Sequence, residues 1–154
     1  MTKRLPVGLT PYAEAMPPPV RLVIGVYAVS TGPAAELEHA VNRRTGGPRC
    51  PLFEISHSVL GQRRAWRRME QQLPVPLRML RQDQVPRELV PVLRRSGLPV
   101  VLGASAPTAQ EPECGSGSAR PDDYQVLIGR TELFGLAGDV DAFAELLSWR
   151  LTGR

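Results

Sequence analysis

The apolar run VRLVIGVYA at residues 20–28 restricts the fold of this chain more than any other feature. Arg21 is its only charged residue, and most of the others are β-branched or aromatic. Such a run predicts a strand that is covered on both faces, as in the sheets of α/β domains. A helix is predicted directly after it, beginning near Pro33 with Ser30 or Thr31 as its cap.

Hydrophobic periodicity and turn residues divide the rest of the chain into short elements. The first helix has an apolar face and ends in RTGGP at residues 44–48. A second helix is predicted at residues 61–73, with Trp66, Met69 and Leu73 on one face. A third is predicted at residues 85–97; it begins at Pro86 and has a kink or a short first turn at Pro91. The last helix is predicted after the cap Asp139, with an apolar stripe of Val140, Phe143, Leu147 and Leu151.

Three further segments have the composition of strands. They are residues 51–56, residues 98–105, and residues 124–138, which read as two strands around Gly129 and Arg130 or as one bulged strand. Residues 74–80 contain two prolines and fit either an edge strand or a loop.

Strands that alternate with helices predict an α/β fold class. We expect a mainly parallel sheet with helices on both faces, followed by a C-terminal hairpin and helix. Residues 1–19 are predicted to be a flexible N-terminal segment, and residues 20–154 a single α/β domain with a flexible loop at about 104–122.

The charge is distributed unevenly along the chain. Residues 1–95 hold 15 Lys or Arg and 7 Asp or Glu, a balance of +8, whereas residues 96–154 hold 4 and 8, a balance of −4. A basic front half suits phosphate or an acidic partner. The near absence of lysine fits the codon bias of a GC-rich genome equally well.

No cofactor or metal site is expected. Cys50 and Cys114 are far apart and have no metal-ligand spacing, and His39 and His57 are too few to add one. Two free thiols, with no apolar segment of the kind that a signal peptide or a membrane span needs, predict a cytoplasmic protein without a membrane partner.

Five short segments resemble, in their order, the catalytic domain of serine recombinases of the resolvase/invertase kind. They are GVYAVST (25–31), FEISHS (53–58), RRAWRRM (63–69), LRMLRQ (77–82) and VLRRSGLPV (92–100), and the resemblance spans residues 20–103. It implies a resolvase-like fold. It also implies phosphoryl transfer on DNA, in which a serine hydroxyl attacks and guanidiniums stabilise the charge on the phosphoryl oxygens.

The resemblance assigns site residues one by one. Ser30 matches the nucleophile, and Arg63, Arg78 and Arg81 match the arginines that contact the phosphate. Ser56 or Ser58 stands near the family's second serine. Nucleic-acid contacts are assigned to further arginines of the predicted helix at 61–73, namely Arg64, Arg67 and Arg68.

The chain also departs from the family pattern. Ala28 replaces the arginine that precedes the nucleophile, and Leu77 and Leu80 replace an aspartate and a glycine. The segment between Met69 and Arg78 is too short for the family's central strand, and no helix-turn-helix follows the domain. Losing one guanidinium from a phosphoryl clamp costs about 10²–10³ in rate, so these departures predict impaired catalysis.

The same residues also have purely structural interpretations. Ser30 suits a helix cap whatever the function. The arginines around Trp66 suit a solvated helix face, Trp66 itself a core anchor, and His57 a structural role.

Two functions therefore remain open, with an active hydrolase or phosphotransferase that uses Ser30 as a third. The first is a recombinase-like domain with impaired catalysis, an accessory or regulatory protein that contacts DNA. The alternative is a small non-enzymatic α/β protein-interaction module or a subunit of a larger assembly. The expected partners are DNA and another protein, or a further copy of the chain.

Overall fold

The structure, a computed structural model, describes residues 19–29, 33–45, 49–58, 60–105 and 120–153. Several predicted features lie outside these residues. They are the N-terminal segment up to residue 18, Ser30, Cys114, and residues 106–119 of the predicted loop.

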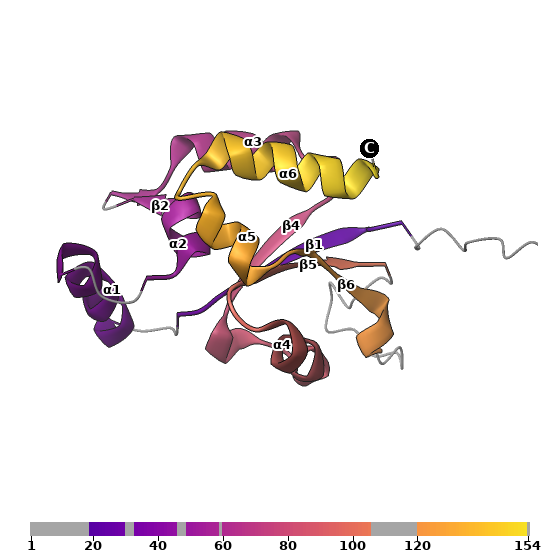
Figure 1. Cartoon of the computed structure of the whole chain (residues 1–154), viewed down its shortest axis with the longest axis horizontal. Helices are drawn as coiled ribbons and strands as arrows, with labels where there is room; N and C mark the ends of the chain where they lie inside the picture. Colours follow the sequence, from indigo (N-terminus) through magenta and orange to yellow (C-terminus); the bar gives the residue numbers. More distant parts are fainter. Residues whose placement is uncertain (1–18, 30–32, 46–48, 59, 106–119, 154) are drawn as a thin grey trace, which may run out of the picture.

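Four strands form one mixed sheet in the order β4-β1-β5-β6 (Figure 1). They are β1 (Leu22–Tyr27), β4 (Leu77–Arg81), β5 (Val100–Ala104) and β6 (Tyr124–Ile128). β1 is parallel to β4 and antiparallel to β5, and β5 is antiparallel to β6. The predicted α/β class is confirmed, but the sheet is not mainly parallel. A buried apolar run has the same composition in either direction, so the sequence pattern did not fix the direction of β5.

Every residue of β1 is buried, as the opening run predicts. The helix α1 (Pro33–Thr45) follows it, close to the predicted bounds. β4 settles the ambiguity at residues 74–80, because the strand begins at Leu77, directly after Pro74 and Pro76, and lies at an end of the described sheet.

The segment at residues 51–56 is a helix, α2 (Pro51–Ser56), and not the strand that we predicted. Its buried residues include Leu52, Ile55 and Ser56, which have the i, i+3, i+4 spacing of one helical face. Pro51 suits the first turn, where its missing N–H costs nothing. Two short paired segments follow, β2 (His57–Ser58) and β3 (Gly61–Gln62), and lead into α3 (Arg64–Gln72).

The predicted C-terminal hairpin is also wrong. β6 is a single strand, and the helix α5 (Arg130–Gly135) begins directly after it. The Gly129 N–H donates to the Glu132 carboxylate at 2.9 Å, which caps the start of α5. The last helix, α6 (Val140–Thr152), is confirmed together with its cap, because the Asp139 side chain accepts from the N–H groups of Asp141 and Ala142.

A β-bulge between β5 and β6 determines which face of the sheet each β6 residue joins. Val101 pairs with Ile128 and Leu102 pairs with Val126, so Leu127 is the extra residue. Leu127 and Ile128 therefore both join the core beneath α2, α3, α5 and α6. Tyr124 and Val126 are left on the opposite face.

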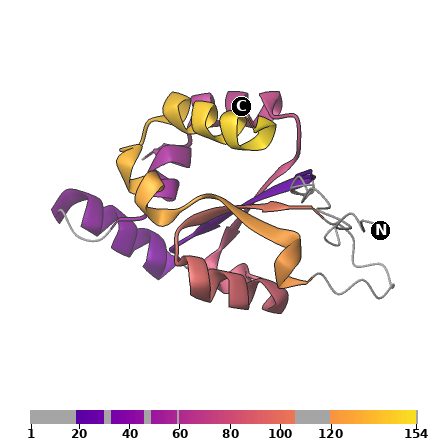
Figure 2. The same cartoon turned by 45° about the vertical axis from the view of Figure 1, so that its right-hand side comes forward.

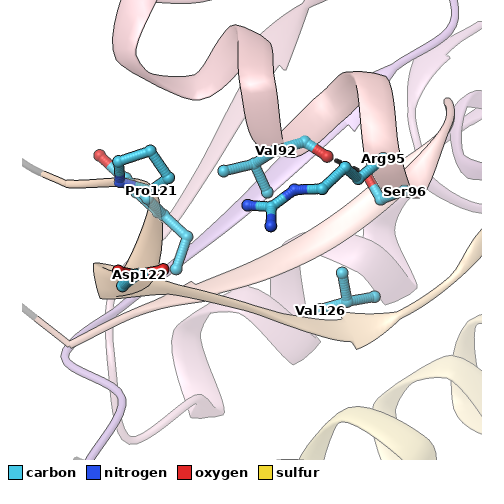
Figure 3. A pocket seen from close by; sticks show the side chains of 7 residues that line it. Val92, Arg95, Ser96, Pro121, Asp122 and Val126 are labelled. Atoms are coloured by element: carbon cyan, nitrogen blue, oxygen red, sulfur yellow. Dashed lines mark hydrogen bonds between the residues drawn. The ribbon is translucent and has the colours of Figure 1, made fainter.

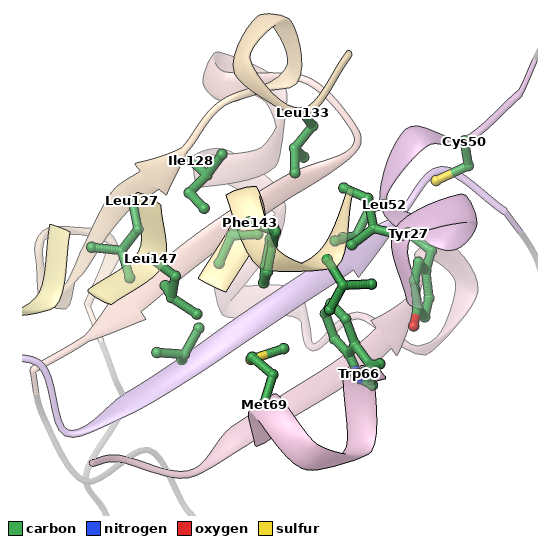
Figure 4. Packing of buried hydrophobic residues seen from close by; sticks show 14 residues of the cluster. Tyr27, Cys50, Leu52, Trp66, Met69, Leu127, Ile128, Leu133, Phe143 and Leu147 are labelled. Atoms are coloured by element: carbon green, nitrogen blue, oxygen red, sulfur yellow. The ribbon is translucent and has the colours of Figure 1, made fainter. Parts of the chain in front are cut away.

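The two faces of the sheet are covered unequally (Figure 2). α2, α3, α5 and α6 lie over one face, where Trp66 packs on Phe143 with ring centroids 5.2 Å apart (Figure 4). On the other face, the described part of the chain places α4 (Val90–Ser96) and short 3-10 turns, Gln82–Gln84, Arg87–Leu89 and Pro121–Asp123. α4 ends at Gly97, as predicted, and its expected short first turn is the 3-10 turn that precedes it.

One helix of about 10 Å diameter is narrower than four strands spaced about 4.8 Å apart. Grooves of about 420 Å³ and about 510 Å³ consequently flank α4 on its two sides.

Candidate functional site

The carboxyl ends of the parallel strands β1 and β4 meet at one edge of the sheet, with Tyr27 opposite Arg81. This edge is where ligands bind in many open α/β sheets. Ser30, the predicted nucleophile, follows β1 in the sequence but lies outside the described residues.

A buried polar network occupies this edge. The Tyr27 Oη lies 2.8 Å from the Ser56 Oγ, which lies 2.8 Å from the His57 Nδ1. The Ser56 Oγ also lies 3.0 Å from the Leu52 carbonyl oxygen, one helical turn earlier. The Phe53 carbonyl oxygen is a fourth neighbour of the Ser56 Oγ, at 3.3 Å. Because a hydroxyl donates one hydrogen bond and accepts two, these partners saturate Ser56. Ser56 is fully buried, so the network fastens α2 to β1.

Burial raises the pKa of Tyr27 to about 12. The nearby Cys50 and Glu70 add to the shift, whereas the hydrogen bond with Ser56 and the charge of Arg81 oppose it. Tyr27 is therefore a protonated phenol at neutral pH. Burial likewise raises the pKa of the Cys50 thiol, which accepts from the Ala28 N–H at 3.4 Å. Neither group is prepared to act as a nucleophile.

Aromatic rings close the network. The Phe53 ring stacks on His57 at a centroid distance of 4.5 Å, and Tyr27 meets Phe53 edge to face at 5.5 Å. His57 is thus held between a stacked ring and a buried hydroxyl, which supports its structural interpretation.

Arg63 forms a bridge within the protein. Its Nε donates to the His57 carbonyl oxygen at 3.2 Å, and its Nη1 donates to the Gly138 carbonyl oxygen at 3.3 Å. The guanidinium thus joins the end of α2 to the turn between α5 and α6, which are far apart in the sequence.

Arg78 and Arg81 lie on opposite faces of the sheet. They are three residues apart in β4, and side chains alternate with period two along a strand. Arg81 lies opposite Tyr27 on the face of α2, whereas Arg78 lies opposite Ile24 on the face of α4. The structure does not bring these two guanidiniums to one phosphate.

Arg64, Arg67 and Arg68 are exposed on α3, whereas Trp66 and Met69 are buried on the other side of the helix. The core role of Trp66 is therefore confirmed. The three arginines form a contiguous basic surface, because residues three and four apart are neighbours on a helix.

Sequence reasoning missed the groove between α4 and β6 (Figure 3). Val92, Arg95 and Ser96 line it from α4, with Pro121, Asp122, Tyr124 and Val126 on the opposite side. Arg95 extends its side chain along the groove in Figure 3. Tyr124 and Val126 are two residues apart, so the sequence shows that they would lie on the same face of a strand. The sequence does not show that the helix α4 is too narrow to cover them.

Among the described residues, no three His, Cys, Asp or Glu side chains gather in a group that would hold a metal ion. None of the helices described is long and apolar enough to cross a membrane.

Comparison with known proteins gives no match to the chain among family models, curated proteins or solved structures.

Proposed function

We propose that this chain is a non-enzymatic α/β protein-interaction module that binds another chain at the outer edge of β6. The observation that carries the proposal is an uncharged strand edge, with which no other described strand pairs, beside a partly apolar groove. β6 is the last strand of the sheet that the described residues form, and its residues are Tyr-Gln-Val-Leu-Ile. Edge strands in soluble proteins usually carry charges, prolines or a cover that prevents pairing.

The hydrogen bonds of β6 indicate which groups face outward. The Ser105 N–H donates to the Asp123 carbonyl oxygen at 3.0 Å, so this opposed pair is hydrogen-bonded. Antiparallel ladders alternate, so Gly103 and Gln125 are the next hydrogen-bonded pair. The N–H and C=O groups of Tyr124 and Val126 therefore point away from β5, where an added strand would meet them.

The polar groups at the carboxyl edge of β1 and β4 support a non-enzymatic function. Ser56 is saturated with hydrogen bonds, Arg63 bonds to two carbonyl oxygens, and Tyr27 is a protonated phenol. Groups that already hold the fold together have little freedom to follow a reacting substrate.

The connectivity leads to the same conclusion for redox chemistry. β1 and the parallel strand β4, with the helices between them, form a βαβ-type unit. Dithiol chemistry in such proteins uses a Cys-X-X-Cys motif. After β1 this chain reads AVSTGPA at residues 28–34, and its two cysteines are Cys50 and Cys114. The proposed module therefore lacks the dithiol.

Photo-crosslinking tests the proposal. A photoreactive phenylalanine analogue replaces Val126, which is 47% exposed, or Ser148 on the exposed side of α6 as the matched control. In cells that express the full chain, position 126 is expected to give a protein adduct that position 148 does not. Equal or absent adducts at the two positions would overturn the proposal.

The basic surface of α3 favours a second function, contact with DNA by a recombinase-like accessory protein. Each phosphate contact contributes about 0.9 to the slope of log K against log salt concentration. Changing Arg64, Arg67 and Arg68 to Gln is expected to lower the slope by up to about 3. The control changes three exposed arginines elsewhere, Arg44, Arg87 and Arg94, to Gln. Equal slopes for the two triple variants would contradict DNA contact through α3.

A further inference from the structure

The charges on either side of β6 differ in sign. Arg120, Asp122 and Asp123 precede the strand and sum to −1, and the strand itself carries no charge. Arg130 follows the strand, and Glu132 in the same helix is paired with Arg150. An antiparallel neighbour with the same sequence would place its basic end against the acidic end of β6. A parallel neighbour with the same sequence would place acid against acid, which costs free energy.

We propose that the chain bound at β6 is a second copy of this protein, paired antiparallel about a twofold axis at Gln125. This proposal rests on the proposed function and names the partner. Two four-stranded sheets would join into one continuous sheet of eight strands.

The outward backbone groups select this register. With the axis at Gln125, Tyr124 of each copy lies opposite the partner's Val126. Both residues direct their N–H and C=O groups away from β5, so the two opposed pairs would form four hydrogen bonds. With the axis at Val126, only one fully outward pair would meet, because the bulge at Leu127 interrupts the alternation.

The side chains suit this register. Tyr124 and Val126 both lie on the α4 face, so each copy would set an aromatic ring beside a β-branched side chain of its partner, a favourable cross-strand pair. The groove beside α4 would continue into the partner's groove, which would cover the exposed Val126. Asp122 would approach the partner's Arg130 at each end.

Disulfide trapping tests the register in the full chain with Cys114 changed to Ser. Opposed residues in a non-hydrogen-bonded antiparallel pair have Cα atoms about 4.5 Å apart, within disulfide range. Gln125→Cys is therefore expected to form a covalent dimer under mild oxidation. Val126→Cys lies farther from its symmetry mate and is expected to give no covalent dimer. A dimer from Val126→Cys but not from Gln125→Cys would overturn this register.

Charge exchange tests the antiparallel pairing without cysteines. Sedimentation of the full chain at increasing concentration is expected to show twice the monomer mass of 16.9 kDa. Asp122→Arg or Arg130→Asp is expected to weaken dimerisation about tenfold, and the double variant to restore it. Val126→Lys is expected to abolish it, with Ser148→Lys as the matched control, and circular dichroism checks that each variant is folded.

A monomer at every concentration, with no effect of Val126→Lys, would overturn the second copy as partner. If photo-crosslinking at position 126 then gives an adduct with a different protein, the proposed function stands and only this inference fails. If it gives none, both fail.

Discussion

At the scale of single residues, the carboxyl edge of β1 and β4 shows polar side chains used for stability. The Tyr27 hydroxyl is buried, and its 2.8 Å hydrogen bond to Ser56 satisfies it. A buried polar group that loses its only partner costs about 1–3 kcal/mol, more than the bond contributes when it is formed. The two side chains should therefore depend on each other energetically.

A double-mutant cycle measures this dependence. Ser56→Ala leaves the Tyr27 hydroxyl without its hydrogen-bond partner and is expected to lower the free energy of unfolding by about 1–3 kcal/mol. In a Tyr27→Phe background the same change is expected to cost less, by about 1 kcal/mol, since no buried hydroxyl is left without a partner. Urea unfolding of the four proteins gives the coupling energy. Additive effects would mean that the bond contributes nothing.

The raised pKa of Tyr27 predicts how stability changes with pH. The phenol ionises near pH 10 in the unfolded chain and near pH 12 in the folded one, so the folded state keeps the proton longer. This contribution to stability is complete below pH 10 and is lost as the pH rises towards 12, in total roughly 2–3 kcal/mol. Tyr27→Phe should remove that part of the decline in urea unfolding at pH 9 to 12. Burial also raises the pKa of Tyr124, which is only half-buried, so Tyr124→Phe should remove a smaller part of the decline. An unchanged decline in the Tyr27 variant would contradict this assignment.

At the scale of elements, long segments with several agreeing signals were predictable from the sequence. The apolar run of β1 is long enough to decide its type, and α6 has both a cap and a regular stripe. Residues 51–56 and 130–135 are short, and six residues with alternating or helical spacing fit either period. Their type depends on tertiary contacts, such as the burial of Leu52, Ile55 and Leu133, which the sequence does not display.

The cap of α6 gives a prediction at this scale. The Asp139 carboxylate accepts from two N–H groups, at 2.9 Å and 3.1 Å, that have no acceptor within the helix. Asp139→Ala is expected to lower the free energy of unfolding by about 1 kcal/mol, and Asp139→Asn by less, because an amide oxygen also caps helices well. Thermal unfolding measures both. Asp141→Ala, in the exposed first turn, should change stability by no more than about 0.5 kcal/mol. Equal losses at positions 139 and 141 would show that charge, and not capping, stabilises this end.

At the scale of the whole molecule, the candidate site was the least predictable part. The resemblance assigned Arg78 and Arg81 to one phosphate, but strand parity separates them once residues 77–81 are known to be a strand. In the sequence, the prolines at positions 74 and 76 left open whether this segment is a strand or a loop. The open edge of β6 depends on strand order, which no local pattern encodes.

The unequal cover of the sheet predicts unequal local stability. α4 has seven residues and is the one α-helix that the described residues place on its face, with grooves on both sides, whereas α6 packs with α3 over the larger core. Local opening needs less free energy where fewer apolar contacts are lost. Native-state hydrogen exchange should therefore show the α4 amides opening with a lower free energy than those of β1, and those of β1 opening only with global unfolding. Dimerisation at β6 should slow exchange at Tyr124 and Val126 as protein concentration rises, because their N–H groups would then be bonded. Equal protection of α4 and β1 would mean that α4 unfolds together with the rest of the protein, and would contradict this prediction.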